Sequence, residues 1–183
     1  MTNPTPQLPW ECDHSEPGPE ILLFRARYNW MRNPRNGATF KTLVLEGRDW
    51  VNVAATTSAG NLVIVRQFRF GTGRTTTEFP AGLVEQDEAP LAAAQRELRE
   101  ETGYTSDDWV SLGSVDANAA FLTNQCHLFL ARNVVKTSET ALDPSEDILV
   151  EEISLDELKT EIESGRFSNA LSVLTAYKVF DLR

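Results

Sequence analysis

The sequence predicts an α/β protein in which a mixed sheet carries helices on both faces. Segments with strand character lie both before and after a helical segment, Leu91 to Thr102, and two more helical segments follow near the C-terminus. Strands that are flanked by helices at separated points along a chain favour a mixed sheet covered on both sides. A length of 183 residues suits one domain with an appendage.

The composition argues against several classes of protein. The chain has 17 Lys and Arg against 27 Asp and Glu, a net charge of −10. This charge disfavours binding to duplex nucleic acid or to anionic membranes, and no apolar run is long enough to span a bilayer. The N-terminus lacks the features of a secretory signal, and Cys12 and Cys126 match no metal-ligand spacing. We expect a cytoplasmic protein with reduced thiols.

The first 48 residues indicate an arm followed by a hairpin. Residues 1–20 are rich in proline and should be irregular. Ile21 to Met31 and Ala38 to Leu45 have strand character, and the Asn-Gly pair at 36–37 between them is a strong hairpin signal. Further strands are expected in five segments: Asp49 to Thr56, Leu62 to Phe70, Trp109 to Asp116, Gln125 to Val135 and Ile148 to Ile153.

Two helices should complete the chain. Ser154 and Glu157 form a capping-box pattern that begins the first, with Leu155, Leu158 and Ile162 facing inward and Gly165 ending it. The last helix is expected over Ser168 to Phe180. Its inward stripe would be Leu171, Leu174 and Tyr177.

The stretch from Gly82 to Tyr104 carries the chemistry. Pro90 suits a first helical turn and Gly103 a C-cap, and the inward stripe would be Leu91, Ala94 and Leu98. Glu97, Glu100 and Glu101 stand at i, i+3 and i+4, so their carboxylates converge. A solvated acidic face is one reading of this pattern. The other is a site for a hard divalent cation such as Mg²⁺, which prefers oxygen ligands.

The same stretch resembles the Nudix box, Gly-x5-Glu-x7-Arg-Glu-U-x-Glu-Glu-x-Gly-U, where U is a bulky aliphatic residue. Each fixed position is filled, and the one departure is Tyr104 at the last U. The resemblance implies an α/β/α sandwich over residues 49–183. It implies metal ligands at the Ala81 carbonyl, Glu97, Glu100 and Glu101, with Mg²⁺ or Mn²⁺ as the metal. The structural residues of the box would be Gly82, Glu88, Arg96 and Gly103.

The resemblance extends to the nucleoside-diphosphate-sugar branch of the family, which includes ADP-ribose pyrophosphatases. Arg66-Gln67-Phe68-Arg69 and Glu78-Phe79-Pro80-Ala81-Gly82 match segments of that branch. They nominate Arg69, Glu78 and Trp50 for substrate binding. Arg69 is equally readable as a surface arginine, and Trp50, like Trp30 and Phe40, as core packing. In this branch residues 1–48 would form an extension that exchanges between the subunits of a homodimer.

The general base has two candidate locations. Glu146 lies in a late acidic loop, Lys136 to Asp147, that resembles the corresponding loop of ADP-ribose pyrophosphatases; the loop is also readable as merely solvated. The alternative base is Glu97, within the box.

Ala119 occupies a place where ADP-ribose enzymes often carry proline. Nucleotide sugars other than ADP-ribose therefore stay among the candidate substrates. The expected activity is metal-dependent cleavage of a nucleoside diphosphate sugar to a nucleoside monophosphate and a sugar phosphate. Two alternatives remain: hydrolysis of dinucleotides such as NADH or diadenosine polyphosphates, and a non-catalytic domain that senses a nucleotide.

Overall fold

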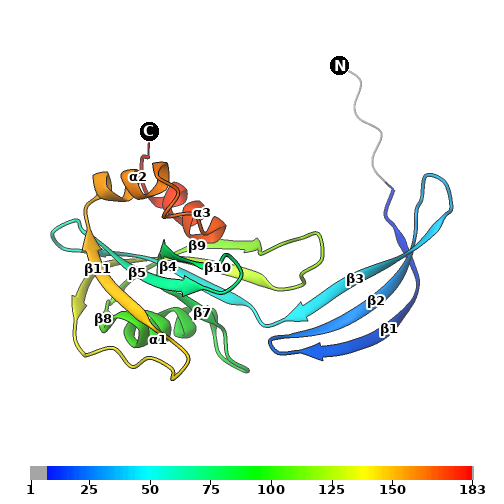
Figure 1. The fold of residues 1–183 in the computed structure, drawn as a ribbon, viewed down its shortest axis with the longest axis horizontal. Helices are drawn as coiled ribbons and strands as arrows, with labels where there is room; N and C mark the ends of the chain where they lie inside the picture. Colours follow the sequence, from blue (N-terminus) through cyan, green and yellow to red (C-terminus); the bar gives the residue numbers. More distant parts are fainter. Residues whose placement is uncertain (1–7, 183) are drawn as a thin grey trace, which may run out of the picture. The chain divides into compact units, whose positions relative to one another are not determined.

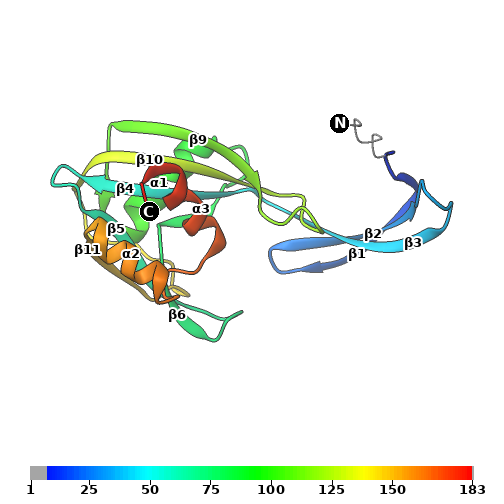
Figure 2. The same cartoon turned by 90° about the horizontal axis from the view of Figure 1, so that it is seen from above.

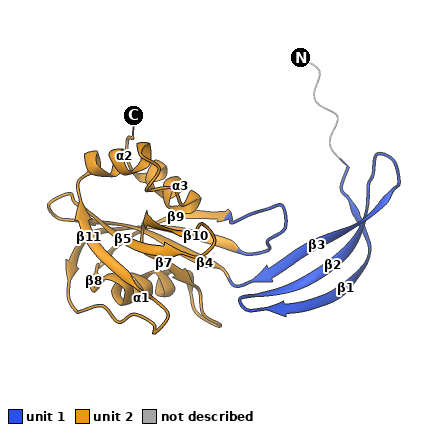
Figure 3. Ribbon diagram, viewed as in Figure 1, with its two compact units in different colours: residues 1–48, 116–124 blue, residues 49–115, 125–183 orange. Residues whose placement is uncertain are grey.

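The structure is a computed structural model that describes residues 8–182, and the chain divides into two compact units (Figure 3). Unit 1 comprises residues 1–48 together with 116–124, and unit 2 comprises residues 49–115 and 125–183. The segment 116–124 therefore belongs to the N-terminal unit although unit 2 surrounds it in the sequence.

Unit 1 is a three-stranded antiparallel sheet in the order β1-β2-β3, made by β1 (Glu11–Ile21), β2 (Phe24–Arg32) and β3 (Thr39–Gly47). The hairpin expected between the last two strands is present. Its loop closes with a bond from Asn33 N–H to the Ala38 carbonyl at 2.9 Å, and Gly37 takes a φ of 71°.

The irregular arm expected over residues 1–20 is wrong for its second half, since β1 occupies Glu11–Ile21. Residues 1–7 lie outside the described residues. β1 is an edge strand, and its register is irregular between Pro17 and Glu20. An edge strand accepts proline because the missing N–H can face solvent, so proline content alone did not exclude a strand.

Unit 2 is built on a sheet of eight strands, and the sheet is mixed, as the sequence predicted. Its path runs β11-β5-β4-β10-β8, with β6 beside β5, β7 beside β4 and β9 beside β10. Strand β4 is parallel to β10 and antiparallel to β5. The strands are β4 (Trp50–Thr57), β5 (Leu62–Arg69), β6 (Arg74–Glu78), β7 (Ala81–Leu83), β8 (Tyr104–Thr105), β9 (Asp108–Asp116), β10 (Gln125–Lys136) and β11 (Ile148–Ile153). The short strands β6, β7 and β8 were not expected.

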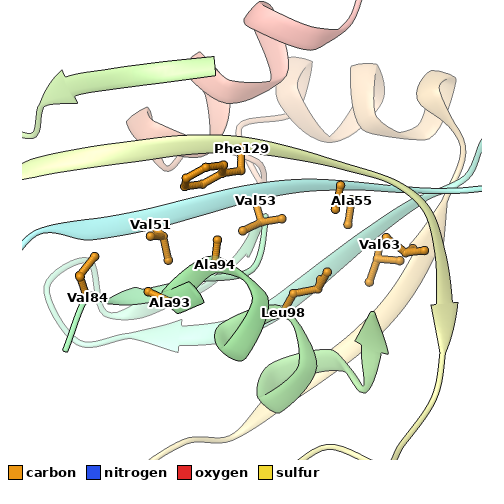
Figure 4. Close-up of a cluster of buried hydrophobic side chains, with 11 residues drawn as sticks. Val51, Val53, Ala55, Val63, Val84, Ala93, Ala94, Leu98 and Phe129 are labelled. Atoms are coloured by element: carbon orange, nitrogen blue, oxygen red, sulfur yellow. The ribbon is translucent and has the colours of Figure 1, made fainter. Parts of the chain in front are cut away.

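Helices cover both faces of this sheet, which confirms the α/β/α sandwich (Figures 1 and 2). On one face, α1 (Pro90–Thr102) buries Ala93, Ala94 and Leu98 against alternate residues of the strands, among them Val51 and Val53 (Figure 4). On the other face, α2 (Leu155–Glu163) and α3 (Ala170–Val179) enclose a second cluster around Ala54, Ile64, Phe79, Leu158 and Phe167. The predicted capping box of α2 is present.

One residue of the predicted α1 face and most of the predicted α3 face are wrong. Leu91 is 41% exposed, although Ala94 and Leu98 are buried as expected. In α3 the buried residues are Ser172, Thr175 and Ala176, whereas Leu174 and Tyr177 are exposed. Helix α3 has apolar residues on all sides, so the spacing of apolar residues did not decide which side packs. Along residues 8–182, no helix combines the length and apolar character that crossing a membrane requires.

Candidate active site

The box begins where β7 meets α1. A Cβ at residue 82 would occupy the space of the Glu97 carboxyl group, so only glycine allows that side chain to lie across the strand. At the far end of the helix, Gly103 takes a φ of 77° and its N–H caps Arg99 at 2.8 Å. A Cβ there would collide with the Ser138 carbonyl oxygen. Backbone surroundings therefore require glycine at residue 103, whereas Gly82 leaves room for the Glu97 carboxyl group in its present position.

Arg96 connects the loop to the helix. Its Nε and Nη2 donate to the two carboxylate oxygens of Glu88 at 3.0 and 2.9 Å, and Nη2 also donates to the Leu83 carbonyl at 2.8 Å. Its Nη1 reaches Glu97 at 2.7 Å and Glu100 at 3.2 Å. The Glu88 hydrogen bonds raise the pKa of Arg96 still further, and Arg96 in turn lowers the pKa of Glu88. Arg96 thus holds one charge among three carboxylates.

Glu97, Glu100 and Glu101 on α1 form a carboxylate patch, and Glu101 is its most buried member. Only 3% of the residue is exposed, and its Oε2 accepts a hydrogen bond from the Ala81 N–H at 3.0 Å. Burial raises its pKa well above the usual range, and the nearby charges of Glu97 and Glu146 add to the effect. Burial likewise raises the pKa of Glu97, against the opposing effect of Arg96. Glu100 is the most exposed of the three.

The residues fit a divalent cation through their donor chemistry. Within residues 8–182, no three His, Cys, Asp or Glu side chains are gathered closely enough to form a ready metal site. Arg96 holds Glu97 and Glu100, and Glu101 bonds to Ala81. A buried carboxylate whose charge is disfavoured, one turn from a second carboxylate, is nevertheless what a hard cation would stabilise. Mg²⁺ is often bound by one or two carboxylates together with substrate phosphates.

Arg69 and Glu78 form a fork-to-fork ion pair between β5 and β6. Nε and Nη2 of Arg69 donate to the two oxygens of Glu78 at 2.8 and 2.7 Å. Glu78 is buried, while the Arg69 side chain is 39% exposed. The Glu78 hydrogen bonds raise the pKa of Arg69, and the charges of Glu101 and Glu146 contribute. Two of the residues nominated for substrate binding are therefore partners, and Arg69 lies within electrostatic range of the carboxylate patch.

The aromatic candidates are divided between the two units. Trp50 is half-buried in β4, opposite Leu83 of β7 and Cys126 of β10. Trp30 belongs to unit 1 and stacks on His14 with ring centroids 4.2 Å apart. Phe40, also in unit 1, contacts Trp10 at 6.2 Å between centroids.

Glu146 is exposed in the loop before β11. Its Oε2 accepts a hydrogen bond from the Asp143 N–H at 3.0 Å. Its charge contributes to the raised pKa of Glu97, Glu101 and Arg69. Two other acidic residues of this region have structural partners. Glu151 pairs with Arg66 at 2.8 Å, and Glu152 accepts from the Tyr104 hydroxyl at 2.6 Å. The latter contact gives a reason for tyrosine at the last position of the box.

Sequence reasoning missed the polar residues around Glu78. Thr76 donates to its Oε1 at 2.6 Å and Asn169 to its Oε2 at 3.0 Å. Ser172, on the first turn of α3, accepts from the Phe79 N–H at 3.2 Å and from the Asn52 side chain at 3.1 Å. An asparagine before a helix signals an N-cap. It does not indicate that the same side chain reaches a strand 91 positions earlier in the sequence.

Comparison with known proteins gives a consistent result. The model of the NUDIX domain matches residues 48–171. The chain is 34% identical over 145 residues to the ADP-ribose pyrophosphatase of Bacillus subtilis, covering 79% of this chain and 77% of that protein. It is 33% identical over 140 residues to the methanol dehydrogenase activator of Bacillus methanolicus, covering 76% of each.

A crystal structure of an ADP compounds hydrolase shares the fold, with a TM-score of 0.84 at 20% identity over 96% of this chain and 94% of that one. The family model covers more than half of the chain and the first of these relatives exceeds 30% identity over most of its own length. The chain belongs to the Nudix hydrolase family.

Proposed function

We propose that this Nudix hydrolase cleaves the diphosphate of a nucleoside diphosphate sugar, with ADP-ribose as the first candidate. The observation that carries the proposal is Arg69, whose partly exposed side chain lies in electrostatic range of the buried Glu101 carboxylate. A diphosphate needs positive charge on more than one oxygen. Two relatives that are ADP-ribose pyrophosphatases, from Bacillus subtilis and Mycobacterium tuberculosis, support the choice of substrate.

The metal in this proposal is Mg²⁺, with Mn²⁺ as an alternative. The Ala81 carbonyl, Glu97, Glu100 and Glu101 are the residues that would hold it. When bound, such a cation neutralises phosphate oxygens and lowers the pKa of water. Arg96 would keep Glu97 and Glu100 aimed toward the patch, as residues behind metal ligands commonly do.

The chain's own residues would bind and orient the reactants. Arg69 would contact a phosphate through its exposed edge, and Glu146 or Glu97 would orient the attacking water. The water oxygen bonds to one phosphorus, the P–O–P bridge breaks, and the bridging oxygen leaves on the other phosphate. The products are a nucleoside monophosphate and a sugar phosphate. We also propose a homodimer, assembled through unit 1, that acts in the cytoplasm, in keeping with two free thiols.

A substrate panel tests this function. The panel holds ADP-ribose, other nucleotide sugars, NADH and diadenosine polyphosphates, with product phosphate released by a phosphatase and measured. We expect ADP-ribose to be cleaved fastest with Mg²⁺ and EDTA to abolish the activity. Fastest cleavage of NADH would instead favour the dinucleotide candidate.

Glu101→Gln is the variant that tests the metal residues, because glutamine keeps the shape but removes the anionic ligand. We expect a loss of about 100-fold or more in kcat. Mn²⁺ should raise the unfolding temperature of the wild type but not that of the variant. Without metal, we expect the variant to fold and to be more stable than the wild type, because a buried charge is removed. Glu163→Gln, an exposed glutamate of α2, is the matched control and should behave as wild type. An active Glu101→Gln would contradict the metal assignment, and a wild type inactive on the whole panel would favour the sensing domain.

A further inference from the structure

The Glu78 carboxylate is saturated with donors inside the protein. It accepts two hydrogen bonds from Arg69, one from Thr76 and one from Asn169, all between 2.6 and 3.0 Å. The residue is only 1% exposed. A buried carboxylate depends on such partners, since each missing donor leaves part of its charge unpaired. Its position is therefore set by residues from β5, β6 and the start of α3.

Asn169 can serve Glu78 in one orientation only. Its Oδ1 accepts from the backbone N–H groups of Leu171 and Ser172 at 3.0 and 3.3 Å, which caps α3. A neutral amide oxygen cannot donate, so the Nδ2 group is the one left to face Glu78. The cap thus fixes which atom of Asn169 points to the carboxylate. The first turn of α3 holds a donor at a defined place.

The position of the Glu78 carboxylate determines the orientation of Arg69. The carboxylate of Glu78 binds Nε and Nη2 of Arg69, so a rotation of that carboxylate turns the planar guanidinium with it. The Arg69 side chain as a whole is 39% exposed and lies in electrostatic range of Glu101 and Glu146.

We propose that Asn169 is a positioning residue, which holds Glu78 so that Arg69 presents its free edge to the diphosphate of the substrate. The inference rests on the proposed function, in which Arg69 binds that diphosphate. It extends the site to a helix that supplies no residue to the box. Through Asn169, the docking of α3 on the sheet becomes a condition of substrate binding.

Two variants separate this role from the helix cap. Asn169→Ser and Asn169→Asp both keep a good N-cap residue, but serine is too short to replace the amide donor, and aspartate places a second anion beside Glu78. We expect KM for ADP-ribose to rise by about 10-fold or more in each, with kcat changed by less than about threefold. Ser154→Ala, which removes the cap of α2, is the control for a general loss of helix stability. Ser154→Ala should have an unfolding temperature comparable to those of the Asn169 variants. Its KM should nevertheless stay within about twofold of the wild-type value.

A double-mutant cycle with Arg69→Gln tests whether the effect passes through the arginine. Once Arg69 is replaced, Asn169→Ser should change KM by less than about twofold, because coupled residues are not additive. An unchanged KM in both Asn169 variants, or the same increase in the Arg69→Gln background, would overturn the positioning role while leaving the proposed function in place. A wild type that hydrolyses no member of the panel would overturn both.

Discussion

At the scale of single residues, Arg96 changes how the acidic cluster of the box is understood. Three glutamates on adjacent helical turns repel one another, and the sequence alone left two readings, a solvated acidic face or a site for a metal cation that balances them. The structure shows that Arg96 already pairs with Glu97, Glu100 and Glu88. The carboxylate that still lacks a positive partner is Glu101, which is buried and has no cationic hydrogen-bond partner among the described residues.

Glu146→Gln tests the general base. Glu146 bonds to the backbone of its own loop and lies in electrostatic range of Glu97, Glu101 and Arg69. If it orients the attacking water, the variant should lose about 10²–10⁴-fold in kcat with little change in KM. Steady-state kinetics on the best substrate of the panel, with Mg²⁺ saturating, measure this.

The controls are Glu139→Gln, in the same loop, and Glu151→Gln, which loses only the ion pair to Arg66. Each should retain most of the activity. A loss below about fivefold in Glu146→Gln together with a large loss in one control would move the role to that residue. Small losses in all three variants would leave Glu97 as the base.

The residues of the box could be predicted because their spacing within one helix and one loop fixes their geometry. The pairing of Arg96 with Glu88 follows from the same local arrangement. The hydrogen-bond partners of Glu78 could not be predicted, because Asn169 and Thr76 reach it only through the packing of α3 and the pairing of β6. Long-range polar contacts of this kind leave no periodic signal in a sequence.

At the scale of elements, the strands and helices with strong local signals were predicted, and the exceptions have identifiable causes. The capping box begins α2 as expected, and the long strands β4, β5, β10 and β11 appear within one or two residues of their expected bounds. Strands β6, β7 and β8 have five residues or fewer, too short for an alternation to be recognised. Helix α3 turns its small polar side inward because Asn169 and Ser172 bond to Glu78 and Phe79.

Helix α2 is attached to the sheet by a charged cluster, and this predicts a pH effect. Glu161 accepts from Thr77 at 2.8 Å, from Arg66 at 3.2 Å and from Arg166 at 3.0 Å. Burial opposes its charge, but these bonds outweigh burial and lower the pKa of Glu161 below 4.5. In acid the unfolded chain therefore binds the proton more readily than the folded one. The stabilisation is complete above pH 4.5 and is lost as the pH falls through the folded pKa.

Glu161→Gln should accordingly lower the free energy of unfolding by about 1–3 kcal/mol at pH 7. The difference from wild type should shrink at a pH below about 4.5. Urea unfolding between pH 7 and 3 measures it. Glu163→Gln, exposed on the same helix, should show a small difference that does not vary with pH. A Glu161→Gln difference that stays constant over the whole range would refute the assignment.

At the scale of the whole molecule, unit 1 exposes much apolar surface. Three strands with one apolar face are about the minimum for an independently stable sheet. At the turn between β1 and β2, Ile21, Leu22 and Leu23 are all exposed, and Leu22 adopts a φ of 48°, which is unfavourable for leucine. Exposed aliphatic residues held in a strained turn are typical of surfaces that are covered in an assembly.

We therefore expect light scattering to give about twice the 20.4 kDa chain mass at micromolar concentration. Leu22→Gly should weaken this dimer about 10-fold or more, because it removes a leucine contact. The same change relieves the backbone strain, so it should not destabilise the chain itself. Leu149→Ala, which alters an exposed leucine of unit 2, is the control. A wild type of monomer mass would refute the dimer.

The parallel pairing of β4 with β10 has a consequence for synthesis of the chain. Trp50 lies opposite Cys126, so the two strands are 76 positions apart in the sequence (126 − 50). The strands of unit 1 pair with immediate neighbours in the chain. At about 5–20 residues per second, a ribosome needs roughly 4–15 s to add the intervening residues. During that interval β4, one of the most buried strands, is without the partner that completes the centre of its sheet.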